Sequence, residues 1–260
     1  MRLVLSRQNA ALREQLDEKR RQLEAELERA AQVQADLLPR TAPNLRGFEL
    51  AARCIPAREV GGDFYDWQEP ADGLLTVTLG DAMGKGMPAA LLMATVRAAL
   101  RSVARQNPPA AALEITSRAL EGDLDRSGSF MTVFHARLDV TTRRLLYVDA
   151  GHGLGMIRRA NGSIEELKPG GLPLGMFPDQ KYQIGSIRMD KGDVLLVFSD
   201  GLLDAGPEPT MAPDRERLGR LISGATSAEE MVDRIMATTV TGAPPPDDLT
   251  VLVLRCTSES

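Results

Sequence analysis

Cysteine and histidine are scarce in this 260-residue sequence, which contains only Cys54, Cys256, His135 and His152. The two cysteines lie far apart, with no C-x-x-C spacing and no run of histidines beside either one. The sequence therefore signals neither a zinc site nor a disulfide framework. We interpret both cysteines as buried or half-buried thiols of a protein in a reducing compartment.

An excess of positive charge is also lacking, because the formal net charge is −5. Such a chain has no overall basic field for holding nucleic acid or an anionic membrane. The opening "MRLVLSRQNA" has too short an apolar run for a signal peptide, and no segment approaches the apolar length that spans a bilayer. We predict a cytoplasmic protein that binds neither nucleic acid nor a membrane.

A Walker-type phosphate loop is missing as well, although "LGDAMGKGMPAALLMAT" resembles one at first sight. That loop requires four residues between its first glycine and Gly-Lys-Ser/Thr. Here three residues separate Gly80 from Gly84, and Lys85 is followed by Gly86 in place of a hydroxyl residue. Nucleotide hydrolysis is therefore disfavoured, and the acidic Asp81 at the start of the stretch needs another explanation.

The first 38 residues differ in kind from the rest, since they contain no glycine or proline and are rich in strong helix formers. They predict one long helix. Its apolar residues recur every seven positions and are interrupted by Lys19 and Glu26. The two rows are Leu16, Leu23, Ala30, Leu37 and Leu5, Leu12, Val33.

This recurrence predicts a weak or adjustable coiled coil, while a merely solvated charged helix remains an alternative. Because such a helix cannot bury its apolar stripe alone, the pattern implies a partner helix or an upstream domain. We expect a homodimer in which residues 1–38 form a linker helix and residues 39–260 form the main domain.

Short β-type runs separated by turn residues follow the helix. The candidate strands are "GFELAARCIP", "LLTVTLGD", "FMTVFHARLD", "RRLLYVDAG", "GMIRRA", "YQIGSIRM", "DVLLVFSD" and "LTVLVLRC". Helical runs are expected at residues 87–106, 109–124 and 228–239. Because strands follow strands and helices follow helices, the pattern predicts antiparallel sheets with helices outside, an α+β architecture.

Acidic residues stand at the ends of several of these strands, most of them beside glycine. They are Asp63, Asp81, Asp200, Asp247 and Asp248. Carboxylates brought together at neighbouring strand ends would repel one another unless a cation neutralised them, and hard oxygen ligands suit magnesium or manganese. The spacing alone leaves two readings open, a metal site or scattered turn aspartates.

Several stretches together carry a resemblance that runs from about Leu37 to the C-terminus. They are "LLPRTAPNLRGFELAARCIPAREVGGDFYDW", "LGDAMGKGMPAALLMATVRAALR", "YVDAGHG", "GGLPLGM", "KGDVLLVFSDGLLDA" and "DDLTVLVLR". In their order along the chain and in their sequence motifs, they resemble the bacterial SpoIIE/RsbU-like branch of the metal-dependent (PPM-type) serine/threonine phosphatases. The resemblance implies a sandwich of two antiparallel β-sheets flanked by α-helices.

The resemblance also implies an activity, the hydrolysis of phosphoserine or phosphothreonine on a partner protein by a metal-activated hydroxide. Typical substrates in this branch are STAS-domain anti-sigma-factor antagonists of stress signalling. Two Mn²⁺ or Mg²⁺ ions are implied, with Asp63 and Asp81 as the first pair of ligands and Asp81 bridging the ions beside the Ala82 carbonyl. Asp200 and Asp247 match the remaining ligands, with Asp248 as the alternative to its neighbour.

The sequence departs from the family at the leaving-group acid and at the phosphate-binding arginine. Met83 stands where eukaryotic relatives have a histidine, so water or a partner residue would donate that proton. His152 is a candidate acid, although a histidine that ties a turn together is the simpler reading. Arg58 is a weak candidate for the arginine, and Glu59 and Asp66 are either outer-shell groups or exposed charges.

Two further possibilities concern the whole protein. A catalytically silent dimeric scaffold of the same fold would bind its partner without hydrolysis, although the intact acidic set argues against it. The helix that begins almost at residue 1 is typical of a linker that follows a sensor domain, such as a receiver, PAS or GAF domain. We therefore expect a regulatory domain upstream.

Overall fold

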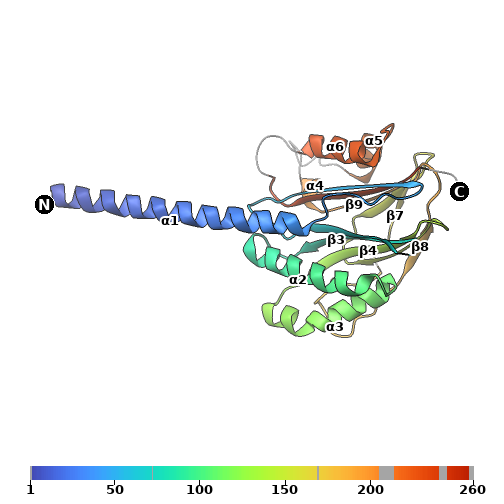
Figure 1. The fold of residues 1–260 in the computed structure, drawn as a ribbon, viewed down its shortest axis with the longest axis horizontal. Coiled ribbons are helices and arrows are strands. Elements are labelled where there is room, and N and C mark those ends of the chain that lie inside the picture. Colours follow the sequence, from blue (N-terminus) through green and yellow to red (C-terminus); the bar gives the residue numbers. More distant parts are fainter. Residues whose placement is uncertain (1, 72, 169, 205–213, 240–244, 258–260) are drawn as a thin grey trace.

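Two five-stranded antiparallel sheets pack face to face in the computed structural model, which describes residues 2–71, 73–168, 170–204, 214–239 and 245–257 (Figure 1). Sheet A has the order β1 (Phe48–Ile55), β10 (Leu249–Cys256), β9 (Val194–Phe198), β6 (Gly155–Arg158) and β7 (Ile164–Glu166). Sheet B has the order β2 (Phe64–Ala71), β3 (Leu74–Ala82), β4 (Met131–Asp139), β5 (Arg144–Ala150) and β8 (Gly185–Arg188).

Helices cover the outer faces of both sheets. Helices α2 (Met87–Ala104) and α3 (Pro109–Ser127) pack on sheet B, and α5 (Arg215–Leu221) and α6 (Ala228–Thr239) pack on sheet A. A short helix, α4 (Gly201–Asp204), follows β9. Apolar clusters fill the space between the sheets and the space beneath each helical layer, so the predicted α+β sandwich is confirmed.

All eight candidate strands and the three helical runs are present, but β2, β7, α4 and α5 were not predicted. Strand β2 reads "FYDWQEPA", and its proline and acidic residues argue against a strand. It lies at the edge of sheet B, where proline is tolerated because one side of the strand makes no ladder hydrogen bonds. The position in the sheet, which the local sequence does not reveal, explains this miss.

The prediction that no segment has the length and apolar composition of a membrane span was wrong. Helix α2 passes that test by length and composition, with a mean hydropathy of 1.2 over 18 residues, and it alone does so in the part of the chain that the structure describes. Its inward side chains, including Met93, Val96 and Leu100, are fully or almost fully buried beneath sheet B. The core helix of a globular domain meets the same criterion for this reason.

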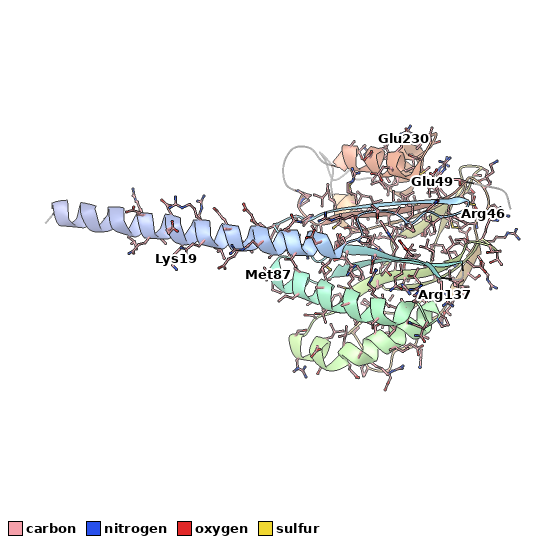
Figure 2. All side chains as sticks on the ribbon, in the orientation of Figure 1. Lys19, Arg46, Glu49, Met87, Arg137 and Glu230 are labelled. Atoms are coloured by element: carbon pink, nitrogen blue, oxygen red, sulfur yellow. The ribbon has the colours of Figure 1, made fainter. Side chains whose placement is uncertain are left out.

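Helix α1 (Arg2–Leu37) projects from the sandwich as a single long rod, which confirms the predicted helix (Figure 1). Leu12, Leu16, Leu23 and Val33 are 55–63% exposed along it, and Figure 2 shows the interrupting Lys19 on the projecting part. The side chain of Leu5 lies outside the described residues. Only the last turns of α1 reach the domain, where they contact α2.

Candidate metal centre

The predicted acidic residues converge at one end of the sandwich. Asp81 lies near the end of β3, and Asp63 directly precedes β2, whose first residue pairs with the neighbour of Asp81. From sheet A come Asp200, two residues after β9, and Asp247, two residues before β10. Charge repulsion from Asp200 and Asp247 acts on Asp81, so the two sheets bring these carboxylates within electrostatic range of one another.

Asp63 is the buried member of this cluster, and Asp81 beside it is half-buried. Asp63 is 3% exposed, and its Oδ2 atom makes no hydrogen bond. Burial, and secondarily repulsion from Asp81, raises the pKa of Asp63 well above its ordinary value. Burial and the charges of Asp200 and Asp247 raise the pKa of Asp81 to about 7. Among the described residues, no positive side chain therefore compensates the charge of this pair.

Asp248 has a different role from its neighbours, because its carboxylate holds the loop that carries Asp63. Oδ1 accepts a hydrogen bond from the Ala57 N–H at 2.7 Å, and Oδ2 accepts from the Gly62 N–H at 2.6 Å and the Asp63 N–H at 3.3 Å. These partners occupy both carboxylate oxygens. Asp248 thus fixes the position of Asp63 relative to β10.

Two glycines are required here for space. A Cβ on Gly61 would lie 2.5 Å from Asp248 Oδ2, and a Cβ on Gly201 would lie 2.2 Å from the Asp248 carbonyl oxygen. Both distances are shorter than any real contact of a Cβ atom. The glycines of "EVGGD" and "SDG" therefore let three chain segments approach one another around Asp248.

Asp247 is neutralised by a cation from within the chain. The ammonium group of Lys85 lies 2.7 Å from Asp247 Oδ2 and donates a hydrogen bond to the Pro246 carbonyl at 2.8 Å. The hydrogen bond to Asp247 raises the pKa of Lys85. In the sequence Lys85 stands out only as part of an incomplete phosphate loop, and its pairing was not predicted, since the two residues are 162 positions apart in sequence numbering.

Asp200 is exposed in the turn between β9 and α4. Its neighbour Ser199 ties this turn to the start of β10, because the Ser199 hydroxyl donates to the Asp248 carbonyl at 3.0 Å and accepts from the Thr250 N–H at 2.9 Å. The Ser199 N–H also donates to the Thr250 carbonyl at 2.9 Å. The two acidic segments of sheet A are therefore held side by side.

The candidate acid His152 is buried, and both of its ring nitrogens lie within hydrogen-bonding distance of protein groups, so it ties a turn together. Burial lowers its pKa to about 4. Met83 is 43% exposed beside the cluster. No side chain in this pair is set up to donate a proton to a leaving group near neutral pH.

The other charged candidates are divided between the site and the fold. Arg58 is exposed, and its guanidinium group lies next to Gly86 in the loop that follows Asp81. Glu59 is exposed beside the end of α1. Asp66 is buried and pairs with Arg101 at 2.6 Å and Arg97 at 3.3 Å, so it anchors α2 on β2 and not the metal cluster.

The residues present fit a divalent cation. Within the described ranges, no three Asp, Glu, His or Cys side chains stand together as a ready-made ligand group. The carboxylate of Asp247 turns toward Lys85, and that of Asp248 turns toward the backbone. These contacts partly explain why the carboxylates do not form one compact group. The Asp63–Asp81 pair, in which one buried carboxylate oxygen of Asp63 is unpaired, still offers the hard oxygen donors that magnesium and manganese prefer.

Comparisons with known proteins find a matching family, similar relatives and similar solved structures. The family described as "Stage II sporulation protein E (SpoIIE)" matches residues 71–257. Phosphoserine phosphatase RsbU of Bacillus subtilis (strain 168) is 30% identical over 240 residues, which cover 90% of this chain and 71% of RsbU.

Solved structures show the same fold. The SiaA-PP2C domain of Pseudomonas aeruginosa superposes with a TM-score of 0.76 at 26% identity, covering 91% of this chain and 98% of that domain. The catalytic domain of the serine/threonine phosphatase PstP, solved in complex with two manganese ions, superposes with a TM-score of 0.62 at 19% identity. The match covers 81% of this chain and 99% of that catalytic-domain chain. At that identity the PstP structure supports the fold alone.

Proposed function

Because the chain belongs to the SpoIIE family and is a phosphatase of the PP2C type, we propose that it hydrolyses phosphoserine or phosphothreonine on a partner protein with two Mn²⁺ or Mg²⁺ ions. The observation that carries this proposal is the Asp63–Asp81 pair. A buried and a half-buried carboxylate with raised pKa values and an unpaired oxygen are stable as anions only beside a cation.

Each acidic residue has a separate task in this proposal. Asp63, Asp81 and the Ala82 carbonyl hold the ions from sheet B, and Asp200 and Asp247 complete the set from sheet A. Asp248 positions the Asp63 loop, because its oxygens already accept three backbone hydrogen bonds. When bound, divalent ions lower the pKa of water and offset charge on the phosphoryl oxygens.

The remaining chemistry falls to few side chains. We assign phosphate binding to Arg58, and its position beside Gly86 and Lys85 at the edge of the cluster supports this assignment. The proton for the leaving serine comes from water or from the substrate protein, because Met83 cannot supply it and both ring nitrogens of His152 already face protein partners.

The substrate class we propose is a STAS-domain antagonist in a stress-response pathway of sigma-factor regulation. Neither Cys54 nor Cys256 forms a disulfide, which supports the proposal of a cytoplasmic location.

Regulation through α1 is part of the same proposal. The exposed leucines pair α1 with its copy in a homodimer, downstream of a sensor domain, and residues 39–260 form the catalytic domain. Gln34 supports this coupling, because its amide donates to the Gly61 carbonyl at 2.7 Å and accepts from the Gly61 N–H at 3.0 Å. A movement of α1 would thus reach the Asp63 loop directly.

A groove of about 310 Å³ between α1 and α2 also supports this coupling. Its lining is largely apolar and includes Val33, Leu37, Met87 and Leu91. The groove continues the apolar stripe of α1 onto α2, whose first turn follows the Asp81 loop. Pairing of the helices would therefore affect both Asp63 and Asp81.

A metal titration with a generic aryl phosphate tests the activity. Turnover that requires Mn²⁺ or Mg²⁺ and disappears with a chelator would support the proposal. Metal binding without turnover, on this substrate and on a phosphorylated STAS protein, would favour the catalytically silent scaffold. Nucleotide triphosphates serve as a negative control, because the chain has no phosphate loop of the Walker type.

A further inference from the structure

His152 connects the two sheets at the end of the sandwich that carries the acidic cluster. It lies in the turn after β5, and its side chain is buried. Nε2 is 2.9 Å from the Phe198 carbonyl oxygen in β9 of sheet A, and Nδ1 is 3.2 Å from the Thr132 hydroxyl in β4 of sheet B. One imidazole ring therefore contacts both layers.

The partners determine the tautomer of this ring. A carbonyl oxygen can only accept, so Nε2 carries the hydrogen and donates it to Phe198. Nδ1 is then the acceptor for the Thr132 hydroxyl, because the neutral ring has one donor and one acceptor. Burial favours the neutral form, in keeping with a pKa lowered to about 4.

The backbone around His152 fixes the ring in place. The Asp149 carboxylate accepts from the N–H of His152 at 2.7 Å and from the N–H of Gly153 at 2.9 Å. The N–H of Phe198 donates to the Leu154 carbonyl at 3.2 Å. The turn is therefore bonded both to the end of β5 and to β9, which leaves the imidazole little freedom.

The two partners of His152 are neighbours of proposed ligands. Thr132 lies directly opposite Asp81 in the β3–β4 register. Phe198 is two residues before Asp200 and ends the strand that delivers it. The path from Asp81 to Asp200 across the sheets thus runs through Thr132, His152 and Phe198.

Among the described residues, the interior that the two sheets share is mostly apolar. Apolar packing is non-directional and does not by itself set the spacing of two carboxylates to a fraction of an ångström. At this end of the sandwich, Asp248 ties β10 to the Asp63 loop, and His152 ties β9 to β4. Together these contacts fix both halves of the cluster.

We propose that His152 is a positioning residue that sets the separation of Asp81 and Asp200, and with it the affinity for the divalent cation. This inference rests on the proposed function. Groups that orient metal ligands without touching the metal typically change metal affinity by about 10–100-fold when they are removed. His152 contacts a neighbour of a proposed ligand in each sheet, Thr132 in sheet B and Phe198 in sheet A, without being a ligand itself.

The test removes the hydroxyl of Thr132 without changing the shape of the side chain. In the 260-residue chain, Thr132→Val should weaken Mn²⁺ binding about tenfold, measured directly by the electron paramagnetic resonance of free Mn²⁺. Turnover at saturating Mn²⁺ should change far less than the Mn²⁺ concentration needed for half-maximal activity. His152→Phe, which lacks both bonds, should weaken binding further.

Thr78→Val is the matched control. The Thr78 hydroxyl lies 2.9 Å from Nδ1 of the other histidine, His135, and this buried pair lies within sheet B, away from the acidic end. Its loss should lower thermal stability to a similar degree and leave Mn²⁺ affinity unchanged. Wild-type affinity in Thr132→Val, or an equal loss of affinity in Thr78→Val, would overturn the role of His152 while the proposed function stands. A wild-type chain that binds no Mn²⁺ would overturn the proposed function itself.

Discussion

Helix α1 and the acidic end of the sandwich depart from the usual burial pattern in opposite directions. Helix α1 keeps Leu12, Leu16 and Leu23 more than half exposed, whereas the acidic end buries Asp63 with one carboxylate oxygen unpaired. Globular proteins normally bury leucine and expose aspartate. In the part of the chain that the structure describes, the exposed leucines of the helix have no apolar surface to cover them, and the Asp63–Asp81 pair has no cation beside it.

The free-energy costs of these two missing partners differ in size. A leucine that stays exposed does not gain the about 1.5–3 kcal/mol that its burial would contribute. A charged helix stays in solution despite this loss. A buried carboxylate without a counter-charge costs several kcal/mol, to the point that its pKa shifts. We therefore expect the cation to be bound tightly and continuously, and the helix to pair more weakly, as suits a regulated contact. Substitutions in each region would test this contrast.

The largest effect is expected at the acidic end. Asp81→Asn should lower metal-dependent turnover by more than about a hundredfold, because a direct ligand matters more than the groups that orient it. Without metal, the same variant should melt at a higher temperature than the wild type, since it removes one of the mutually repelling charges. Phosphatase assays and thermal unfolding in chelator would measure the two effects.

Asp66→Asn gives the opposite pattern and serves as the control. This buried aspartate is already neutralised by Arg97 and Arg101, so its loss should lower the melting temperature and leave the Mn²⁺ requirement in place. If Asp81→Asn keeps wild-type turnover, or if the two variants behave alike, the contrast between an unpaired and a paired carboxylate is wrong.

The second effect concerns the pairing of α1. Leu16→Asp combined with Leu23→Asp should raise the dimer dissociation constant at least about a hundredfold, because the two chains of the dimer together lose the apolar contacts of four leucines. Analytical ultracentrifugation would measure the constant, and assays at fixed Mn²⁺ would report the change in turnover. A truncated chain that begins near Pro39 should behave in the same way.

Arg21→Gln combined with Ala25→Asp lowers the net charge by the same two units on exposed positions away from the apolar rows. This control should leave the dimer intact. A monomeric wild-type chain, or leucine variants that dissociate with no change in turnover, would separate the helix from regulation and leave the chemistry standing.

The third prediction concerns pH and applies to the sandwich alone, since the charged side chains along the described part of α1 are exposed. His135 is fully buried, and burial, helped by the charge of Arg137, lowers its pKa to about 4 from an ordinary value of 6.5. The unfolded chain then binds a proton that the folded chain does not, so stability is complete above pH 6.5 and is lost as the pH falls toward 4. The loss attributable to this histidine is about 1.4 kcal/mol per pH unit.

His135→Asn should reduce this pH dependence, because the amide does not titrate. Urea unfolding of wild type and variant between pH 7 and pH 4.5 would give the two slopes, with chelator present so that metal binding does not contribute. Equal slopes would show that His135 is protonated in the folded chain.

The smallest effect is expected for Lys85. Its ammonium group pairs with Asp247 at the surface, where such pairs contribute about 0.2–1 kcal/mol. Lys85→Gln should therefore tighten Mn²⁺ binding by no more than about fivefold, because the cation no longer competes with an internal charge for Asp247. Weaker binding in this variant would mean that Lys85 organises the site instead of opposing the metal.

Much of the fold could be predicted from the sequence because the signals are local. Alternating apolar runs such as "LTVLVLRC" and the unbroken helix formers before Pro39 each determine their own element. Strand β2 could not be predicted in this way, since its proline is acceptable only at a sheet edge. The position of a strand in its sheet is a property of the whole fold.

The acidic residues could be found in the sequence, but their separate roles could not. Asp247 and Asp248 are adjacent and chemically identical, yet one pairs with Lys85 and the other accepts hydrogen bonds from Ala57, Gly62 and Asp63. The partners of Asp248 are more than 180 positions away in the sequence. No local pattern distinguishes the two residues.

The sequence by itself determined which residues form strands and helices, and that several of the strands end in carboxylates, because side-chain periodicity and turn chemistry act over a few neighbouring residues. Only the tertiary structure decided which carboxylates meet, which of them lacks a counter-charge, and that His152 joins the two sheets beside them. These outcomes depend on hydrogen bonds and charges between segments that come together only when the two sheets pack face to face.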